Sequence, residues 1–182
     1  ILSAIDGVLF LDNAYVEFSD TDYRSLMNEF DNLVIGRTMS KAFALAGARV
    51  GYAFVPRWLV PFYQRAATPF TLNSVSAIAA AGALADRERM DEYVSYVRKW
   101  RDRFRKECPL SSPASGANFI MFDTRPMSGD EMVRLLAGKG VIVRSCASFP
   151  GLPDHYIRVS IGDVWENETF LTAISEICRS QR

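Results

Sequence analysis

The stretch GRTMSKAFALAGARVGY, residues 36–52, places Lys41 directly after Ser40 and puts Arg49 eight residues beyond the lysine. Small or apolar residues fill nearly all of the positions between them, and the chain is apolar again on both sides of the stretch. Lysines usually lie among polar neighbours. A lysine amine in apolar surroundings is partly desolvated, which makes it a better nucleophile.

A lysine of this kind can bind an aldehyde cofactor as a Schiff base. Ser40 and Arg49 would then hold the phosphate of that cofactor, because a hydroxyl donates one hydrogen bond and a planar guanidinium donates two to neighbouring oxygens. The spacing alone leaves a second interpretation open, in which a lysine and an arginine simply flank a buried turn.

Three stretches resemble fold-type I pyridoxal-phosphate aminotransferases. The form S-K-A-F-x-L-A-G-x-R-x-G-Y is similar to their lysine signature, and most of all to that of the histidinol-phosphate aminotransferase branch. DNAYVEF (Asp12–Phe18) resembles the family's D-E-A-Y-x-E-F with Asn13 in place of glutamate, and PFTLNS (Pro69–Ser74) resembles a loop near the active site and subunit interface. The resemblance implies pyridoxal 5'-phosphate bound to Lys41, with Ser40 and Arg49 at its phosphate.

The apolar run Val8–Leu11 ends at Asp12 and predicts a buried parallel strand. Ligands of open α/β sheets bind outside the carboxyl ends of the strands, where Asp12 would lie. A carboxylate there would keep the ring nitrogen of the cofactor protonated, and the phenol of Tyr15 would reach the ring oxygen. The alternative for Asp12 is a capping role in the next turn.

Two arginines stand inside apolar strands, Arg144 in VIVRS and Arg158 in YIRVSIG. Such a residue either emerges on the solvent face by alternation or meets an anion. IRVSIG resembles the strand that carries the substrate-anion arginine of these aminotransferases, and the histidinol-phosphate branch uses a second arginine on the preceding strand. Two guanidiniums suit a dianionic phosphate better than a single carboxylate.

Hydrophobic periodicity predicts alternating strands and helices in the rest of the chain. Strands are expected at Leu33–Gly36, Arg49–Val55, Asn118–Asp123, Val141–Ser145 and Tyr156–Gly162. Helices are expected at Ser19–Phe30, Trp58–Arg65, Ser74–Glu107 with a break near Asp86, Ser128–Gly138 and Glu166–Ser180. The resemblance implies an α/β fold: the end of a large cofactor-binding domain with a mostly parallel sheet (residues 1–84), then a long linking helix and a small α+β C-terminal domain (residues 85–182).

Composition excludes several classes of function. Lys plus Arg equals Asp plus Glu at 21 each, so no net charge recruits nucleic acid or an anionic membrane. The apolar runs are too short or too interrupted by charge to span a bilayer. Three widely spaced cysteines indicate reduced thiols in a cytoplasmic protein, and a single histidine (His155) disfavours a metal site; we expect no metal.

Together, these observations predict an aminotransferase that moves an amino group between a phosphorylated amino alcohol or amino acid and 2-oxoglutarate. The resemblance implies a homodimer and a longer enzyme of which this is the C-terminal part, inactive alone. A threonine-phosphate decarboxylase or another amino-acid aminotransferase of the same fold remains open. So does a non-catalytic aminotransferase-like sensor domain.

Overall fold

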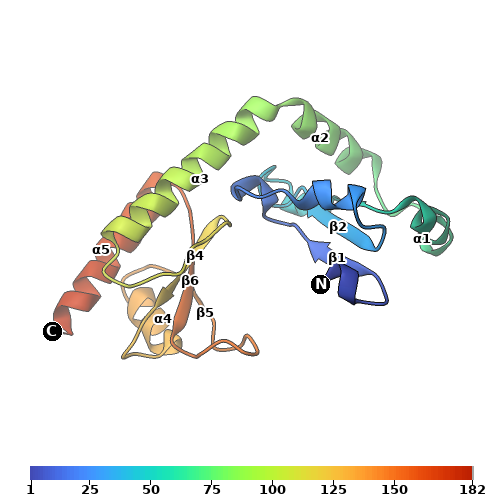
Figure 1. Cartoon of the computed structure of the whole chain (residues 1–182). Helices are drawn as coiled ribbons and strands as arrows, with labels where there is room; N and C mark the ends of the chain where they lie inside the picture. Colours follow the sequence, from blue (N-terminus) through green and yellow to red (C-terminus); the bar gives the residue numbers. More distant parts are fainter. Residues whose placement is uncertain (182) are drawn as a thin grey trace. The chain divides into compact units, whose positions relative to one another are not determined.

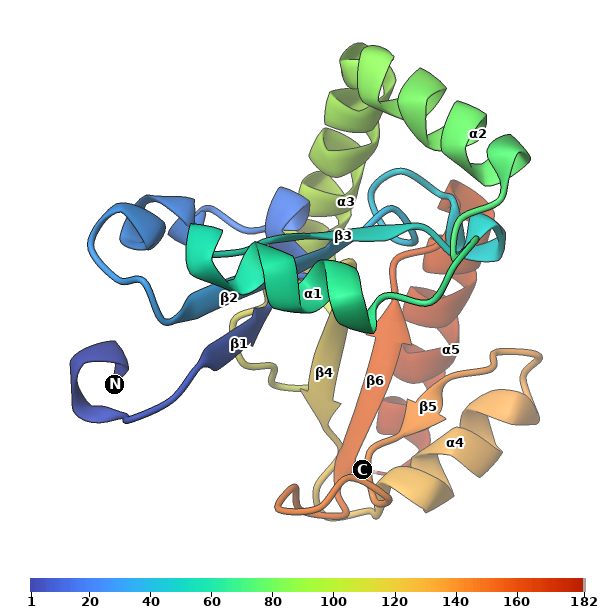
Figure 2. The same cartoon turned by 90° about the vertical axis from the view of Figure 1, so that its right-hand side faces the viewer.

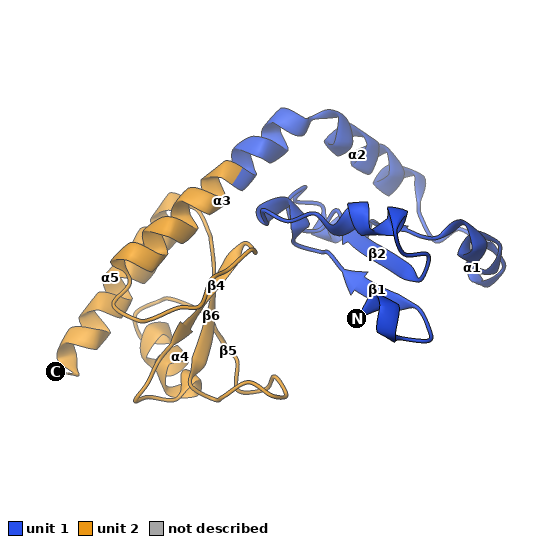
Figure 3. Ribbon diagram, in the orientation of Figure 1, with its two compact units in different colours: residues 1–94 blue, residues 95–182 orange. Residues whose placement is uncertain are grey.

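The computed structural model describes residues 1–181 and divides the chain into two compact units, Ile1–Val94 and Ser95–Arg182 (Figure 3). Each unit contains its own three-stranded sheet, and the path of the chain through both can be followed in Figure 1. The expected boundary after residue 84 concerns the domains of a complete protein and remains a prediction.

The sheet of unit 1 has the order β1–β2–β3. Its strands are β1 (Leu9–Asp12), β2 (Leu33–Thr38) and β3 (Gly51–Phe54). β1 runs parallel to β2 with Asp12 opposite Gly36, whereas β3 runs antiparallel with Gly51 opposite Thr38. The carboxyl ends of β1 and β2 and the start of β3 therefore lie at the same edge of the sheet.

Burial differs between the central and the outer strands of this sheet. Leu33, Val34 and Ile35 are buried in the central strand β2. The prediction that the first strand is buried is wrong in the described chain, since Leu9 and Leu11 are only half-buried and Phe10 is 61% exposed. β1 is an edge strand, and within the described residues of unit 1 no layer covers the face that carries the Phe10 ring.

Short 3-10 helices make most of the connections in unit 1. They are η1 (Leu2–Ala4), η2 (Val16–Phe18), η3 (Tyr23–Asn28), η4 (Ala46–Ala48) and η5 (Arg57–Leu59). The helix expected over Ser19–Phe30 is wrong in type and length, because only η3 forms there. None of its residues is buried, so this stretch lacks the packed face that stabilises a longer helix.

Three α-helices complete this half of the chain: α1 (Val60–Ala66), α2 (Ser74–Ala85) and α3 (Arg87–Glu107). Asn73 caps α2 through its side-chain oxygen, which accepts from the backbone N–H of Ser76 at 2.8 Å. The predicted break near Asp86 is confirmed, since its φ of −93° and ψ of 67° are not helical. α3 runs on from unit 1 into unit 2.

Unit 2 is an antiparallel sheet of order β4–β6–β5. Its elements are β4 (Phe119–Asp123), α4 (Gly129–Ala137), β5 (Arg144–Ser145), β6 (Tyr156–Ser160) and α5 (Val164–Ser180). Figure 2 shows α4 and α5 on one face of this sheet. α5 begins before the expected Glu166 because Asp163 and Glu166 form a capping box at its start.

β5 is shorter than the strand expected over Val141–Ser145. The backbone N–H of Val141 donates to the carbonyl of Leu136 at 2.9 Å, so this residue still belongs to the turn that ends α4. Only Arg144 and Ser145 pair with β6, opposite Arg158 and Ile157.

The core of unit 2 lies between the sheet and the helices. Ile120 and Phe122 of β4 alternate with Phe119 and Met121, and only the first pair is fully buried. The rings of Phe104, Phe122 and Phe170 meet there, with centroids 5.1 to 6.4 Å apart. Among residues 1–181, no helix is both long and apolar enough to cross a membrane.

Truncating the central ring of this cluster should weaken unit 2. Phe104 is fully buried, so Phe104→Ala removes the ring contacts and leaves a cavity that costs about 3–5 kcal/mol of unfolding free energy. Urea denaturation followed by tryptophan fluorescence measures the change. Ile142→Ala is the control, because Ile142 is 83% exposed and should change stability by less than about 0.5 kcal/mol. Equal effects of the two substitutions would contradict the assignment of the core.

A buried carboxylate anchors the loop after β4. Asp123 accepts hydrogen bonds from the Arg125 backbone N–H at 3.0 Å and from Arg125 Nε at 3.0 and 2.9 Å. His155 is partly buried, with its Nε2 4.0 Å from the Asp123 carboxylate. The side-chain hydrogen bonds of Arg125 hold the pKa of Asp123 below its ordinary value.

The lowered pKa makes stability depend on pH in the acid range. The ionised carboxylate stabilises the folded state above its ordinary pKa of about 3.9, and this contribution is lost as the pH falls through the lowered folded value. Asp123→Asn should therefore reduce the unfolding free energy at neutral pH, with a difference from the parent that shrinks in acid. Urea titrations at several pH values, with the exposed Asp102→Asn as control, test this. A difference independent of pH would contradict it.

Candidate active site

In unit 1, five polar or charged side chains that could bind a cofactor come from three segments, and these segments meet at one edge of the sheet. Asp12 ends β1, and Tyr15 follows in the next turn. Ser40 and Lys41 follow the end of β2, and Arg49 lies two residues before β3. Since the strand directions bring these ends to one edge, the structure gathers all five residues that the sequence singled out in this half.

Burial on either side of the lysine holds its loop in place. Met39 and Ala42 are 1% and 4% exposed, whereas Ser40 and Lys41 between them are partly exposed. Met39 packs in a cluster with Val50 and Ala80, and its backbone N–H donates to the carbonyl of Val50 at 3.0 Å. The loop is therefore anchored by its apolar residues, which leaves its polar ones accessible.

The lysine amine lies over an aromatic ring. Lys41 Nζ is 5.5 Å from the centre of the Tyr15 ring, within the range of a cation–π contact. Asp12 Oδ1 accepts from the backbone N–H of Ala14 at 3.0 Å, which is the turn contact that the sequence also allowed. That bond fixes the carboxylate and occupies only one of its two oxygens.

The serine hydroxyl is oriented by a neighbour. Thr38 Oγ1 lies 2.9 Å from Ser40 Oγ and donates to it, and it accepts from the Ser40 backbone N–H at 3.1 Å. With its oxygen accepting from Thr38, the Ser40 hydroxyl can give its own proton to an anion. No role was assigned to Thr38 from the sequence. The T-x-S spacing could have indicated one, because it lets the threonine hydroxyl hydrogen-bond to the residue two positions later.

Arg49 has a left-handed backbone, with a φ of +55°. This conformation costs a residue other than glycine about 1–2 kcal/mol, so the surrounding turn must impose it. The Arg49 Nη1 donates to the carbonyl of Ala46 at 3.0 Å, and the other N–H groups of the guanidinium remain able to donate hydrogen bonds. The edge thus offers an amine, a carboxylate, a phenol and two groups that can donate hydrogen bonds to a phosphate. This set fits pyridoxal phosphate.

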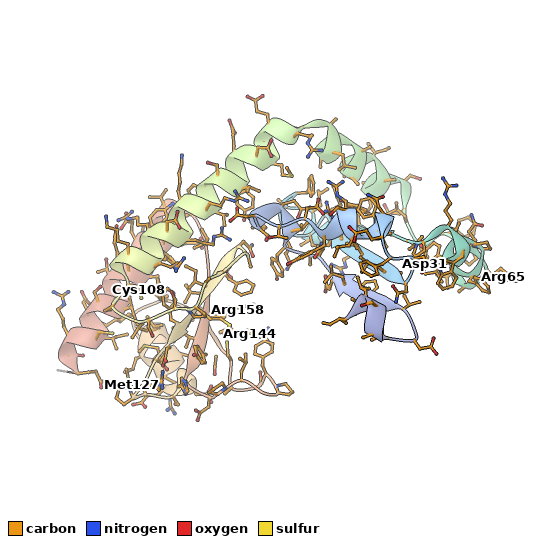
Figure 4. All side chains as sticks on the ribbon, in the orientation of Figure 1. Asp31, Arg65, Cys108, Met127, Arg144 and Arg158 are labelled. Carbon is orange, nitrogen blue, oxygen red and sulfur yellow. The ribbon has the colours of Figure 1, made fainter. Side chains whose placement is uncertain are left out.

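Arg144 and Arg158 belong to unit 2, where they occupy directly opposed positions on β5 and β6 (Figure 4). Opposed residues of an antiparallel pair project from the same face of the sheet. The guanidinium of Arg144 stacks on Phe149 at 4.7 Å, and that of Arg158 stacks on Phe119 at 5.0 Å. Arg158 Nε is buried and has no hydrogen-bond partner among the residues that the structure describes.

The arginine pair borders a cavity of about 510 Å³ in unit 2. Ser160, Trp165 and Thr169 also line it. Burial raises the pKa of the nearby Cys146 thiol, while Arg158 and Arg144 act in the opposite direction, as two cations facing one space should. This arrangement suits an anion with several oxygens. Within residues 1–181, no group of three His, Cys, Asp or Glu side chains could hold a metal ion.

Residues 2–174 match the family described as Aminotransferase class I and II, and the chain belongs to that family. The solved histidinol-phosphate aminotransferase of Clostridium acetobutylicum has a TM-score of 0.88 and 25% identity to this chain, covering 95% of it and 55% of the other. The enzyme of Sinorhizobium meliloti, in complex with pyridoxal-5'-phosphate, has a TM-score of 0.83 and 26% identity, covering 96% and 50%. The expected α/β fold of pyridoxal-phosphate-dependent aminotransferases is thereby confirmed.

A curated relative points to one branch of the family. The histidinol-phosphate aminotransferase of Methanoculleus marisnigri is 66% identical over 177 residues, covering 97% of this chain and 50% of that protein. The protein of the same name from Methanosarcina mazei is 39% identical over 181 residues, covering 100% and 49%. The chain therefore spans about half the length of the curated relatives it matches.

Proposed function

We propose that this chain is the C-terminal half of a pyridoxal-phosphate-dependent aminotransferase that acts on histidinol phosphate with 2-oxoglutarate as amino acceptor. The observation that carries the proposal is the meeting of Asp12, Tyr15, Ser40, Lys41 and Arg49 at one edge of the sheet. The 66% identity to a histidinol-phosphate aminotransferase supports the choice of substrate.

Each residue at the edge then has a role. The bound cofactor supplies an electron sink for negative charge that develops at the substrate Cα. Lys41 Nζ would bind the cofactor aldehyde and would serve as the base that takes the proton from that Cα. Asp12 keeps the ring nitrogen protonated and Tyr15 donates to the ring oxygen. Ser40 and Arg49 hold the phosphate in place.

In the second unit, we assign Arg144 and Arg158 to the anionic group of the substrate. Two planar guanidiniums on one face match the oxygens of a dianionic phosphate, and the unpartnered Arg158 Nε leaves one donor unused for such a ligand. The pair would serve a phosphorylated decarboxylation substrate equally well. A threonine-phosphate decarboxylase is therefore the second candidate, and analysis of the reaction product distinguishes the two.

We also propose that the enzyme is a homodimer in the cytoplasm. Phe70, Val75 and Ile78 are 101%, 78% and 73% exposed in and after the stretch that resembles a subunit-interface loop. Exposed apolar residues this close together are typical of interaction surfaces. None of the three cysteines forms a disulfide in the described chain, which suits a reducing compartment.

Lys41 should be the residue that carries the cofactor. Borohydride reduction of the complete holoenzyme, followed by mass spectrometry, should give a pyridoxyl adduct on the peptide that contains Lys41. Lys41→Ala should lack the visible band of the bound cofactor and lose transamination by about 10²–10⁴-fold or more. Lys139→Ala is the control, since Lys139 pairs with Glu176 in unit 2. An adduct on Lys139 or Lys99, or none at all, would favour a sensor domain without turnover.

Removing one arginine should weaken capture of the substrate phosphate. Arg158→Gln loses a charge-assisted contact worth about 1.5–3 kcal/mol, so KM for histidinol phosphate should rise by about tenfold or more. Activity towards histidinol, which lacks the phosphate, should change much less. Arg105→Gln alters an exposed arginine of the same unit and should leave both values unchanged. Parallel losses with both substrates would contradict the assigned role.

A further inference from the structure

Arg37, four residues before Lys41, has a side chain that is only 10% exposed. Its Nη2 donates to Asp22 Oδ1 at 2.8 Å, and its Nη1 lies 4.0 Å from Glu17 Oε1. The guanidinium also stacks 5.4 Å from the centre of the Phe54 ring. Tyr52 lies directly opposite Arg37 on β3, on the same face of the sheet.

These partners lie next to the segments that carry the proposed cofactor contacts. Glu17 follows Tyr15 by two residues, within η2. Arg37 itself stands three residues before Ser40, at the end of β2. Tyr52 comes three residues after Arg49, in β3. One guanidinium therefore connects all three segments that meet at the sheet edge.

We propose that Arg37 is a positioning residue, which holds these three segments in the register that the cofactor requires. The inference rests on the proposed function and deepens it. Arg37 acts only through Tyr15, Ser40, Lys41 and Arg49, and it does not itself contact the cofactor.

Stability alone does not explain why Arg37 and Glu17 keep their charged groups only 10% exposed. Burial raises the pKa of Glu17 although Arg37 is close, so desolvation outweighs the attraction for this carboxyl. Arg37 Nε is also buried without a hydrogen-bond partner in the described chain. A buried ion pair is often no more stable than a well-packed apolar replacement, and its best-supported use is to fix one geometry.

Arginine suits this position because its planar fork reaches several partners in fixed directions. A lysine would keep the charge but could not pair with Glu17 and Asp22 and stack on the Phe54 ring at the same time. The cluster also supplies a matched control. Arg24 pairs with the same Asp22 at 2.7 Å and lies over the same Phe54 ring, but its side chain is 55% exposed. Apart from that ring, Arg24 contacts none of the three segments through its ion pair.

The test compares Arg37→Met, Arg37→Lys and Arg24→Gln in the complete holoenzyme. Loss of a residue that orients binding groups typically costs 10–100-fold in affinity or activity, so Arg37→Met should weaken pyridoxal-phosphate affinity by about that factor. The affinity is measured by titrating the visible absorbance. At saturating cofactor, kcat should fall while KM for histidinol phosphate changes by less than about twofold. Arg37→Lys should recover part of the loss, and Arg24→Gln should behave like the parent.

Each outcome decides a different question. Folded Arg37→Met protein with the parent's cofactor affinity and kcat would overturn the inference, as would equal losses in Arg24→Gln. If Arg37→Met does not fold, Glu17→Gln decides, because it keeps the shape and removes one charge; unchanged affinity and kcat would then overturn the inference. A parent that forms no adduct on Lys41 would instead refute the proposed function.

Discussion

The pairing of β1 with β2 and of β2 with β3 is the constraint on which unit 1 depends. Parallel pairing sends the ends of β1 and β2 to one edge, and antiparallel pairing starts β3 at the same edge. Residues separated by up to 37 positions, from Asp12 to Arg49, are thereby brought to one place. A shift of one residue in either register would turn the side chains of the shifted strand to the opposite face and displace the loop that follows or precedes it.

The lysine loop shows how apolar packing and polar chemistry share a short stretch of chain. Met39 and Ala42 are buried, and the two polar residues between them remain accessible. Thr38 orients the serine, while the left-handed backbone at Arg49 turns the chain back into β3. The strain at Arg49 is tolerated because Val50, the next residue, belongs to the same apolar cluster as Met39.

Much of this could be predicted from the sequence, since motif and periodicity report local geometry. The lysine loop, the break at Asp86 and the helical stripe containing Phe104 were all accessible in that way. The helix expected over Ser19–Phe30 failed because its periodic residues find no surface to pack against. β5 was overestimated because β-branched residues at 141–143 could not reveal that Val141 bonds back to α4. The role of Thr38 was not predicted, because it depends on a hydroxyl contact that apolar periodicity does not encode.

The opposed arginines of β5 and β6 favour anion binding in the proposed function but lower the stability of the sheet. Like charges directly across a strand pair destabilise a sheet, and here the rings of Phe149 and Phe119 stack against the two guanidiniums. Replacing either arginine by a β-branched residue would be an easy route to a more heat-resistant protein. Under the proposed role of the pair in ligand capture, selection for thermal tolerance and selection for activity act in opposite directions on the same two residues.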